Sequence, residues 1–138
     1  MAPKKLLNCL KKRDLLNSDH ADKSLLISLG EQFGQEGRLS DSIDFFEKAE
    51  HIEGLNKLRE QCGAEGDFFL YLRLMKILAE SPGSEEWVRL GDTALGRGKL
   101  LFARSAYREA DHREKLAHVE ELLSLSPQDR TPDKLVLH

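Results

Sequence analysis

The chain has 138 residues, which is enough for one domain that buries roughly two-thirds of the surface exposed by its unfolded form. Hydrophobic residues make up 40% and charged residues 33% of the sequence, which is typical of a water-soluble helical protein and excludes a disordered or membrane-embedded one. The net charge of −3 is too small to indicate nucleic-acid binding by the chain as a whole.

The charge is unevenly distributed along the sequence. Residues 1–23 carry six basic and three acidic side chains, so the remainder holds a net charge of −6. We expect residues 1–22 to contain a basic helix that caps one end of the fold. Its lysines and arginine offer a surface for nucleic acid, but no aromatic residue is interleaved with them, which disfavours that partner.

Helical periodicity runs through the chain, and no window shows the alternation of a strand. We predict eight helices, near residues 4–16, 23–36, 40–50, 52–63, 67–80, 85–97, 100–111 and 112–125. Asp67 and Ser84 precede two of these helices and are predicted to accept hydrogen bonds from free backbone amides. Gly37, Gly66 and Gly98 follow helical runs, where glycine adopts the left-handed geometry that ends a helix.

The sequence after the last predicted helix differs from the rest. Residues 126–138 contain two prolines and scattered charges, so we expect a flexible C-terminal tail. Its apolar element is Leu135-Val136-Leu137. No apolar run anywhere in the chain is long enough to cross a membrane.

The strongest signal is an internal repeat. When the chain is shifted by 61 residues, 26–58 aligns with 87–119 without a gap, and eight of the 33 pairs are identical. Ordinary residue usage would give about two. A fixed period implies stacked units that cannot bury their apolar faces alone.

Both copies place small, leucine and aromatic residues in one frame. In the second copy the frame contains Trp87, Leu90, Gly91 and Ala94, then Ala103, Tyr107 and Ala110. In the first copy it contains Leu26, Leu29, Gly30 and Phe33, then Ser42, Phe46 and Ala49. This pattern resembles tetratricopeptide repeats (TPR). The resemblance implies an all-α fold, a right-handed αα-solenoid of stacked TPR-like helix-turn-helix units over residues 23–125.

The frame also predicts how the helices pack. Its glycines are expected where two helix backbones approach closely, and its aromatic residues should fill the spaces between helices. A less regular unit lies between the two copies, with Arg59 in the glycine position and Tyr71 in a small-residue position. Successive units start 29, 32 and 29 residues apart, against 34 in the family. The helix near 112–125 lacks a partner helix and is expected to cap the stack.

No motif indicates catalysis, a cofactor or a metal. The sequence has no phosphate loop, GxSxG elbow, HExxH or cysteine–histidine cluster with zinc spacing. His51 and His112 recur at predicted helix junctions, which favours a structural role over metal binding or acid–base chemistry. Cys9 and Cys62 are isolated, which is typical of a reduced, cytoplasmic protein. We therefore expect a protein that is not an enzyme and needs no cofactor.

One constellation suggests a binding surface. The first helix of each unit carries an acid directly after the glycine position, namely Glu31, Glu60, Asp92 and Glu121. A second acid column contains Glu53, Glu85 and Glu114. Ile27, Asn56 and Val88 lie between the two columns. The resemblance to TPR proteins implies that these positions line a concave, acidic groove. The alternative is that solvated helix faces collect acids by chance.

These observations predict a protein–protein interaction module, an adaptor or scaffold that holds a peptide or helix of a partner protein in the groove. The acids favour a basic partner. Two alternatives stay open. One is a structural subunit that forms homo-oligomers through its leucine-containing end segments. The other, which is weaker, is a nucleic-acid accessory protein that acts through the basic N-terminal helix.

Overall fold

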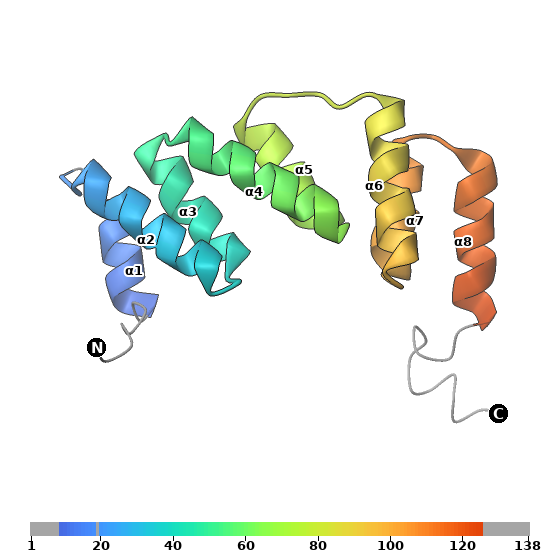
Figure 1. Ribbon diagram of the computed structural model, residues 1–138, viewed down its shortest axis with the longest axis horizontal. Helices are drawn as coiled ribbons and strands as arrows, with labels where there is room; N and C mark the ends of the chain where they lie inside the picture. The colour runs from blue at the N-terminus through green and yellow to red at the C-terminus, as the bar shows by residue number, and fades with distance from the viewer. Residues whose placement is uncertain (1–8, 19, 126–138) are drawn as a thin grey trace. The chain divides into compact units, whose positions relative to one another are not determined.

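The computed structural model describes residues 9–18 and 20–125, and these residues form eight α-helices and no strand (Figure 1). The helices are α1 Cys9–Asn17, α2 Lys23–Gln35, α3 Leu39–Ala49, α4 Ile52–Glu65, α5 Phe68–Ile77, α6 Ser84–Gly96, α7 Leu100–Glu109 and α8 Arg113–Leu125. The predicted all-α fold class is therefore confirmed. The first residues of the predicted 4–16 helix and the predicted 126–138 tail lie outside the described residues.

The chain divides into two compact units, one up to Arg59 and one from Glu60 onward, so the division falls within α4. The expected boundaries of the TPR-like region, residues 23 and 125, stay predictions. No helix within the described part of the chain has both the length and the apolar character needed to cross a membrane.

The first unit is organised around the packing of α2 against α3. Its core contains Leu26, Phe33, Phe45 and Ala49, and the rings of Phe33 and Phe45 stack with their centroids 5.3 Å apart. The helix α1 also contacts α3. There Lys12 forms ion pairs with Asp41 and, at 2.6 Å, with Asp44. One of the basic residues considered as a surface for nucleic acid therefore has its charge neutralised inside the unit.

The second unit is built around α7, which packs against α5, α6 and α8. One group of core residues lies between α5, α6 and α7 and contains Phe68, Trp87, Leu90, Ala106 and Ala110. Another lies between α6, α7 and α8 and contains Ala94, Ala103, Tyr107 and Val119. The expectation that α8 caps the stack stays a prediction.

The turn inside each helix pair has the same backbone geometry. Gly37, Gly66 and Gly98 have φ values of +78°, +72° and +74°, as the sequence predicted. After each glycine, a backbone amide donates to the carbonyl five residues earlier; Arg38 donates to Phe33, for example, at 2.9 Å. These bonds satisfy carbonyls that the end of a helix leaves without partners. The glycines are 29 and 32 residues apart, which are the spacings of the predicted units.

The turns between successive pairs repeat as well, and here the left-handed residue is not glycine. Glu50, Ala79 and Asp111 have φ values of +54°, +56° and +54°. The amide of the next residue again donates to the carbonyl five residues earlier, as His51 does to Phe46 at 2.9 Å. The spacings are the same 29 and 32 residues. The irregular middle pair, α4 and α5, therefore ends in the same local turn as its neighbours, although six residues connect α5 to α6 and only two connect α3 to α4.

The two repeated glycines lie where an aromatic ring touches a helix backbone. A Cβ atom on Gly30 would lie 2.5 Å from Cε1 of Phe46, and one on Gly91 would lie 2.5 Å from Cε1 of Tyr107. Atoms do not approach this closely, so replacing either glycine with a larger residue would displace the aromatic ring. Both glycines are therefore packing requirements, as the frame predicted. In the first unit, the buried Ser42 hydroxyl also donates to the Gly30 carbonyl at 2.6 Å.

The predicted cap at Ser84 is wrong, whereas the one at Asp67 is confirmed. Asp67 accepts a hydrogen bond from the Leu70 amide at 3.1 Å. Ser84, however, is the first residue of α6, and its hydroxyl donates to the Ala110 carbonyl at 2.7 Å. That partner lies 26 residues away at the end of α7, so local sequence could not reveal it. The bond ties the start of α6 to the end of α7.

Two glycines on α6 provide a matched test of this packing. Gly91→Ala should lower the free energy of unfolding by about 1–3 kcal/mol, because the new methyl group overlaps the Tyr107 ring. Gly96→Ala adds the same methyl group where no atom lies within 4 Å, and it should leave stability unchanged or raise it by up to about 1 kcal/mol. Urea unfolding followed by the fluorescence of Trp87, the single tryptophan, measures both. Equal stabilities of the two variants would contradict the assigned packing.

Candidate functional site

The first acid column divides between the two units. Glu31 lies on α2 in the first unit, and Glu60, Asp92 and Glu121 lie on α4, α6 and α8 in the second. All four residues are exposed. Glu31, Glu60 and Glu121 form no ion pair with any residue that the structure describes. The expectation that all four line one groove stays a prediction.

Asp92 differs from the other three because its carboxylate has internal partners. The Tyr107 hydroxyl donates to Oδ1 at 2.6 Å. Lys115 donates to Oδ1 at 2.8 Å and to Oδ2 at 3.1 Å. These contacts join α6 to α7 and α8. The negative charge of Asp92 is therefore largely neutralised by contacts within the second unit. The sequence analysis did not predict this role.

The pKa values around Asp92 follow from these contacts. Burial alone would raise the pKa of Asp92, but the hydrogen bonds from Lys115 and Tyr107 and the charge of Lys115 outweigh burial and lower it. The pKa of Tyr107 is raised, first because burial disfavours the phenolate and then because its hydroxyl donates to the Asp92 carboxylate. Tyr107 therefore remains a hydrogen-bond donor at neutral pH.

Asp92→Asn tests this contact by its dependence on pH. A carboxyl group with a lowered folded-state pKa stabilises the fold above its unfolded-state pKa of about 4, and this stabilisation is lost as the pH falls through the folded-state pKa. The variant should therefore be less stable than the parent at pH 7, by no more than about 1 kcal/mol because 47% of the side chain is exposed. The difference should shrink below about pH 4.

Urea unfolding at several pH values measures this difference. Glu60→Gln is the control, because Glu60 is exposed and has no ion pair among the described residues, so its effect should be small at every pH. A stability difference for Asp92→Asn that stays constant as the pH falls would contradict the role assigned to Asp92.

The second acid column has a local structural explanation. Glu53, Glu85 and Glu114 each lie in the first turn of a helix, α4, α6 and α8 respectively. There the positive end of the helix dipole favours a negative charge. Glu53 also faces Lys57 at 3.8 Å, but both side chains are 74% exposed, so this pair contributes little. These acids remain accessible to a partner while also stabilising their own helices.

The apolar side chains between the two acid columns are partly buried against the core. Ile27 packs against the core of the first unit, and Val88 packs against both core groups of the second. Asn56, on α4, is half-buried. Only part of each side chain is therefore available to a partner.

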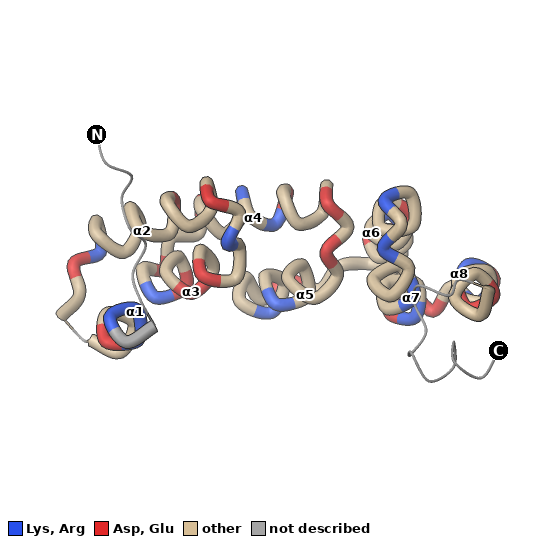
Figure 2. The backbone as a smooth tube through the Cα atoms, turned by 90° about the horizontal axis from the view of Figure 1, so that it is seen from below, with Lys and Arg blue, Asp and Glu red and all other residues tan. Residues whose placement is uncertain are grey.

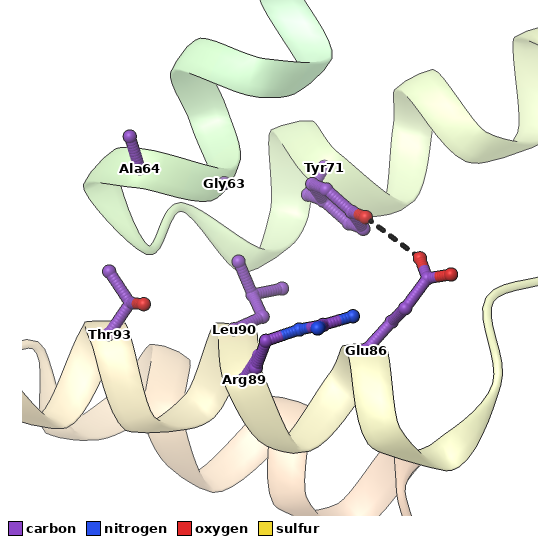
Figure 3. A pocket seen from close by; sticks show the side chains of 7 residues that line it. All are labelled: Gly63, Ala64, Tyr71, Glu86, Arg89, Leu90 and Thr93. Carbon is purple, nitrogen blue, oxygen red and sulfur yellow. Dashed lines mark hydrogen bonds between the residues drawn. The ribbon is translucent and has the colours of Figure 1, made fainter.

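A cavity of about 310 Å³ lies in the second unit, between the end of α4, α5 and α6 (Figure 3). It is lined by Gly63, Ala64, Tyr71, Glu86, Arg89, Leu90 and Thr93. The Tyr71 hydroxyl donates to Glu86 Oε2 at 3.3 Å, and the Tyr71 ring packs edge-on against Trp87. Arg89 forms no ion pair with any described residue. A guanidinium group and a carboxylate therefore lie side by side at the cavity wall.

This cavity coincides with a departure from the repeat. Tyr71 occupies the frame position that holds Ser42 in the first copy and Ala103 in the second, and both of those residues are fully buried. A tyrosine is too large for such a position, and its ring lies against Gly63, where a Cβ atom would be 3.5 Å from Cε1. The sequence showed the irregular residue, but the volume that it leaves open depends on the packing of three helices.

The histidines and Cys62 have structural surroundings. His51 and His112 directly precede α4 and α8, and Nδ1 of His112 accepts a hydrogen bond from the Lys115 amide at 3.2 Å. Cys62 is fully buried, and burial, with the nearby charges of Asp67 and Glu65, raises the pKa of its thiol to about 12. Within the described ranges, no group of three or more histidine, cysteine or acidic residues could hold a metal ion.

Comparison of the chain with protein-family models, with curated proteins and with solved structures found no match.

Proposed function

We propose that this chain is a non-catalytic protein-interaction module built from TPR-like helix-turn-helix units stacked as an αα-solenoid. It holds a basic peptide or helix of a partner protein along its first helices, α2, α4, α6 and α8. The observation that carries the proposal is the set of three exposed carboxylates, Glu31, Glu60 and Glu121, at one repeat position and without an ion pair among the described residues.

The repeated turns support the stacking part of the proposal. Three consecutive helix pairs share left-handed turn residues, and the turns inside the pairs and those after them have the same two spacings, 29 and 32 residues. Such units bury their apolar faces against neighbouring units. Helices in contact are about 8–10 Å apart, which sets the scale of the spacing between acids on adjacent helices.

The charges explain why the partner segment is basic. Carboxylates about 8–10 Å apart repel one another only weakly at physiological salt, where screening acts over about 8 Å. A lysine or arginine placed between two of them gains attraction from both. The half-exposed Ile27 and Val88 add limited apolar contact. Affinity should therefore decrease as the salt concentration rises.

The cavity beside Arg89 suits the backbone of a bound segment. A guanidinium group donates hydrogen bonds and has no acceptor, whereas a carboxylate only accepts them. Arg89 can therefore bind a peptide carbonyl while Glu86 binds a peptide amide. The two charges cancel, so this cavity does not oppose a basic partner.

Neutralising the three unpaired acids tests the proposal. The triple variant Glu31→Gln, Glu60→Gln and Glu121→Gln should capture at least about tenfold less partner protein than the parent, since tenfold corresponds to only about 1.4 kcal/mol. The immobilised full chain is exposed to a native lysate at low and at physiological salt, and captured proteins are quantified by mass spectrometry. Asp92 is left unchanged, because its replacement would disturb the contacts between α6, α7 and α8.

A matched control changes the same number of charges elsewhere. Glu36, Glu109 and Glu120 are also exposed, and they lie outside both acid columns. Replacing these three with glutamine should leave capture within about twofold of the parent, a difference below about 0.5 kcal/mol. Equal losses in both triple variants would mean that net charge alone drives binding. Undiminished capture by the first variant would refute the acidic groove.

A further inference from the structure

In the second compact unit, α5 and α7 are each the second helix of a helix pair, and both expose large apolar side chains. Phe69 on α5 is 58% exposed, and Leu101 on α7 is 47% exposed. Phe69 packs edge-on against the half-buried Phe102, with ring centroids 5.6 Å apart, so it contacts α7 at the residue that follows Leu101 in the sequence. Single exposed apolar residues are common on protein surfaces, but an adjoining group indicates an interaction site.

Phe69 and Leu101 occupy the same position in the repeat, because they are 32 residues apart, which is the spacing between these two helix pairs. Lys76 and Arg108 are separated by 32 residues as well, and each follows the exposed apolar residue of its helix by seven. Residues seven apart lie on the same face of a helix. Two neighbouring helices therefore present the same order, first apolar and then basic.

Positive charge predominates on these two helices. α5 carries Arg73 and Lys76 and no acidic residue, and Figure 2 shows blue but no red along this helix. α7 carries Arg104 and Arg108 against Glu109. Arg108 lies 3.8 Å from Glu120 with 60% of its side chain exposed, so this pair is weak. The buried Nε of Arg104 has no hydrogen-bond partner among the described residues.

A second cavity lies at the apolar end of this surface. It has a volume of about 240 Å³ and is lined by Gly98, Lys99, Leu100, Leu101 and Phe102. A volume of this size accommodates one large apolar side chain, and the lining is mainly aliphatic and aromatic. The corresponding position of α3 is Ser40, and Glu47 lies seven residues later, so the first unit has no equivalent of this surface.

We propose that α5 and α7 form a second docking surface, which binds an acidic amphipathic segment of a partner protein. Phe69, Leu101 and Phe102 contact apolar side chains of that segment, and Lys76, Arg104 and Arg108 pair with its carboxylates. This surface lies on the second helices, whereas the acid columns lie on the first helices. The inference therefore goes beyond the proposed function and does not depend on it.

The apolar part of the surface favours a protein over a nucleic acid. A bound base stacks on an accessible ring face, and only one aromatic residue here, Phe69, is largely exposed. Leu101 offers no stacking surface. Burial of leucine and phenylalanine side chains beside cations is instead the usual way in which a groove binds an amphipathic helix.

A designed peptide tests the proposal directly. The probe is a labelled synthetic helix with leucines at i, i+3, i+4 and i+7 and glutamates at most other positions, titrated into the full chain by fluorescence anisotropy. Phe69→Ser with Leu101→Ser should weaken its binding at least about tenfold, since apolar anchors dominate such interfaces. Lys76→Glu with Arg108→Glu should weaken it similarly. The same peptide with lysine in place of glutamate should bind at least about tenfold more weakly to the parent.

The controls distinguish binding at this surface from non-specific binding to exposed apolar side chains. Ile52 and Leu125 are 54% and 70% exposed, so Ile52→Ser with Leu125→Ser removes as much exposed apolar surface elsewhere and should leave binding within about twofold. The Glu31, Glu60 and Glu121 triple variant should also bind the acidic peptide at least as well as the parent. Circular dichroism checks that each variant remains helical.

Three outcomes would overturn the proposal. The first is unchanged peptide binding by both the serine pair and the charge-reversed pair. The second is equal binding of the glutamate and lysine peptides. The third is competition in which a single-stranded oligonucleotide displaces the peptide and loses affinity in the same variants, which would assign the surface to nucleic acid.

Discussion

The contact between a helix backbone and an aromatic ring determines much of the remaining structure. In the second unit, the Tyr107 ring lies against Gly91, and the hydroxyl group therefore reaches the next residue, Asp92. In the first unit, Phe46 lies against Gly30 in the same way, but it has no hydroxyl group to offer Glu31. The Tyr107 hydroxyl and Lys115 together bind Asp92, whereas the first unit has Phe46 and Gly54 at the equivalent positions and leaves Glu31 without these partners.

The two proposed surfaces differ in charge and lie on different helices. The three unpaired carboxylates of the first acid column lie on first helices, and the basic residues of the proposed second surface lie on α5 and α7 beside exposed apolar side chains. A module with both proposed surfaces would bind two partner segments of opposite charge. Each surface would repel the segment that fits the other, because like charges in an interface oppose binding. The two proposals together describe an adaptor that joins two different proteins.

The sequence predicted the features that depend on neighbouring residues. Eight helices and the left-handed glycines were evident because periodicity and turn residues act over a few positions. The partners of Ser84 and Asp92 were not evident, since they lie 26, 15 and 23 residues away and depend on how helices pack. The cavity at Tyr71 was missed for a related reason. A residue that breaks the repeat can be recognised from the sequence, but the space around it is a property of three helices together.

The turns at Glu50, Ala79 and Asp111 have a consequence for how such units diverge. A left-handed backbone at a residue with a side chain costs about 1–2 kcal/mol, and glycine would remove this strain while losing more conformational freedom on folding. The two effects oppose each other, so the net advantage of glycine at this position is only on the order of 1 kcal/mol. A glutamate, an alanine and an aspartate hold the same conformation within one chain. Repeated units can therefore differ in residue type at such a turn while they keep the same backbone torsion angle.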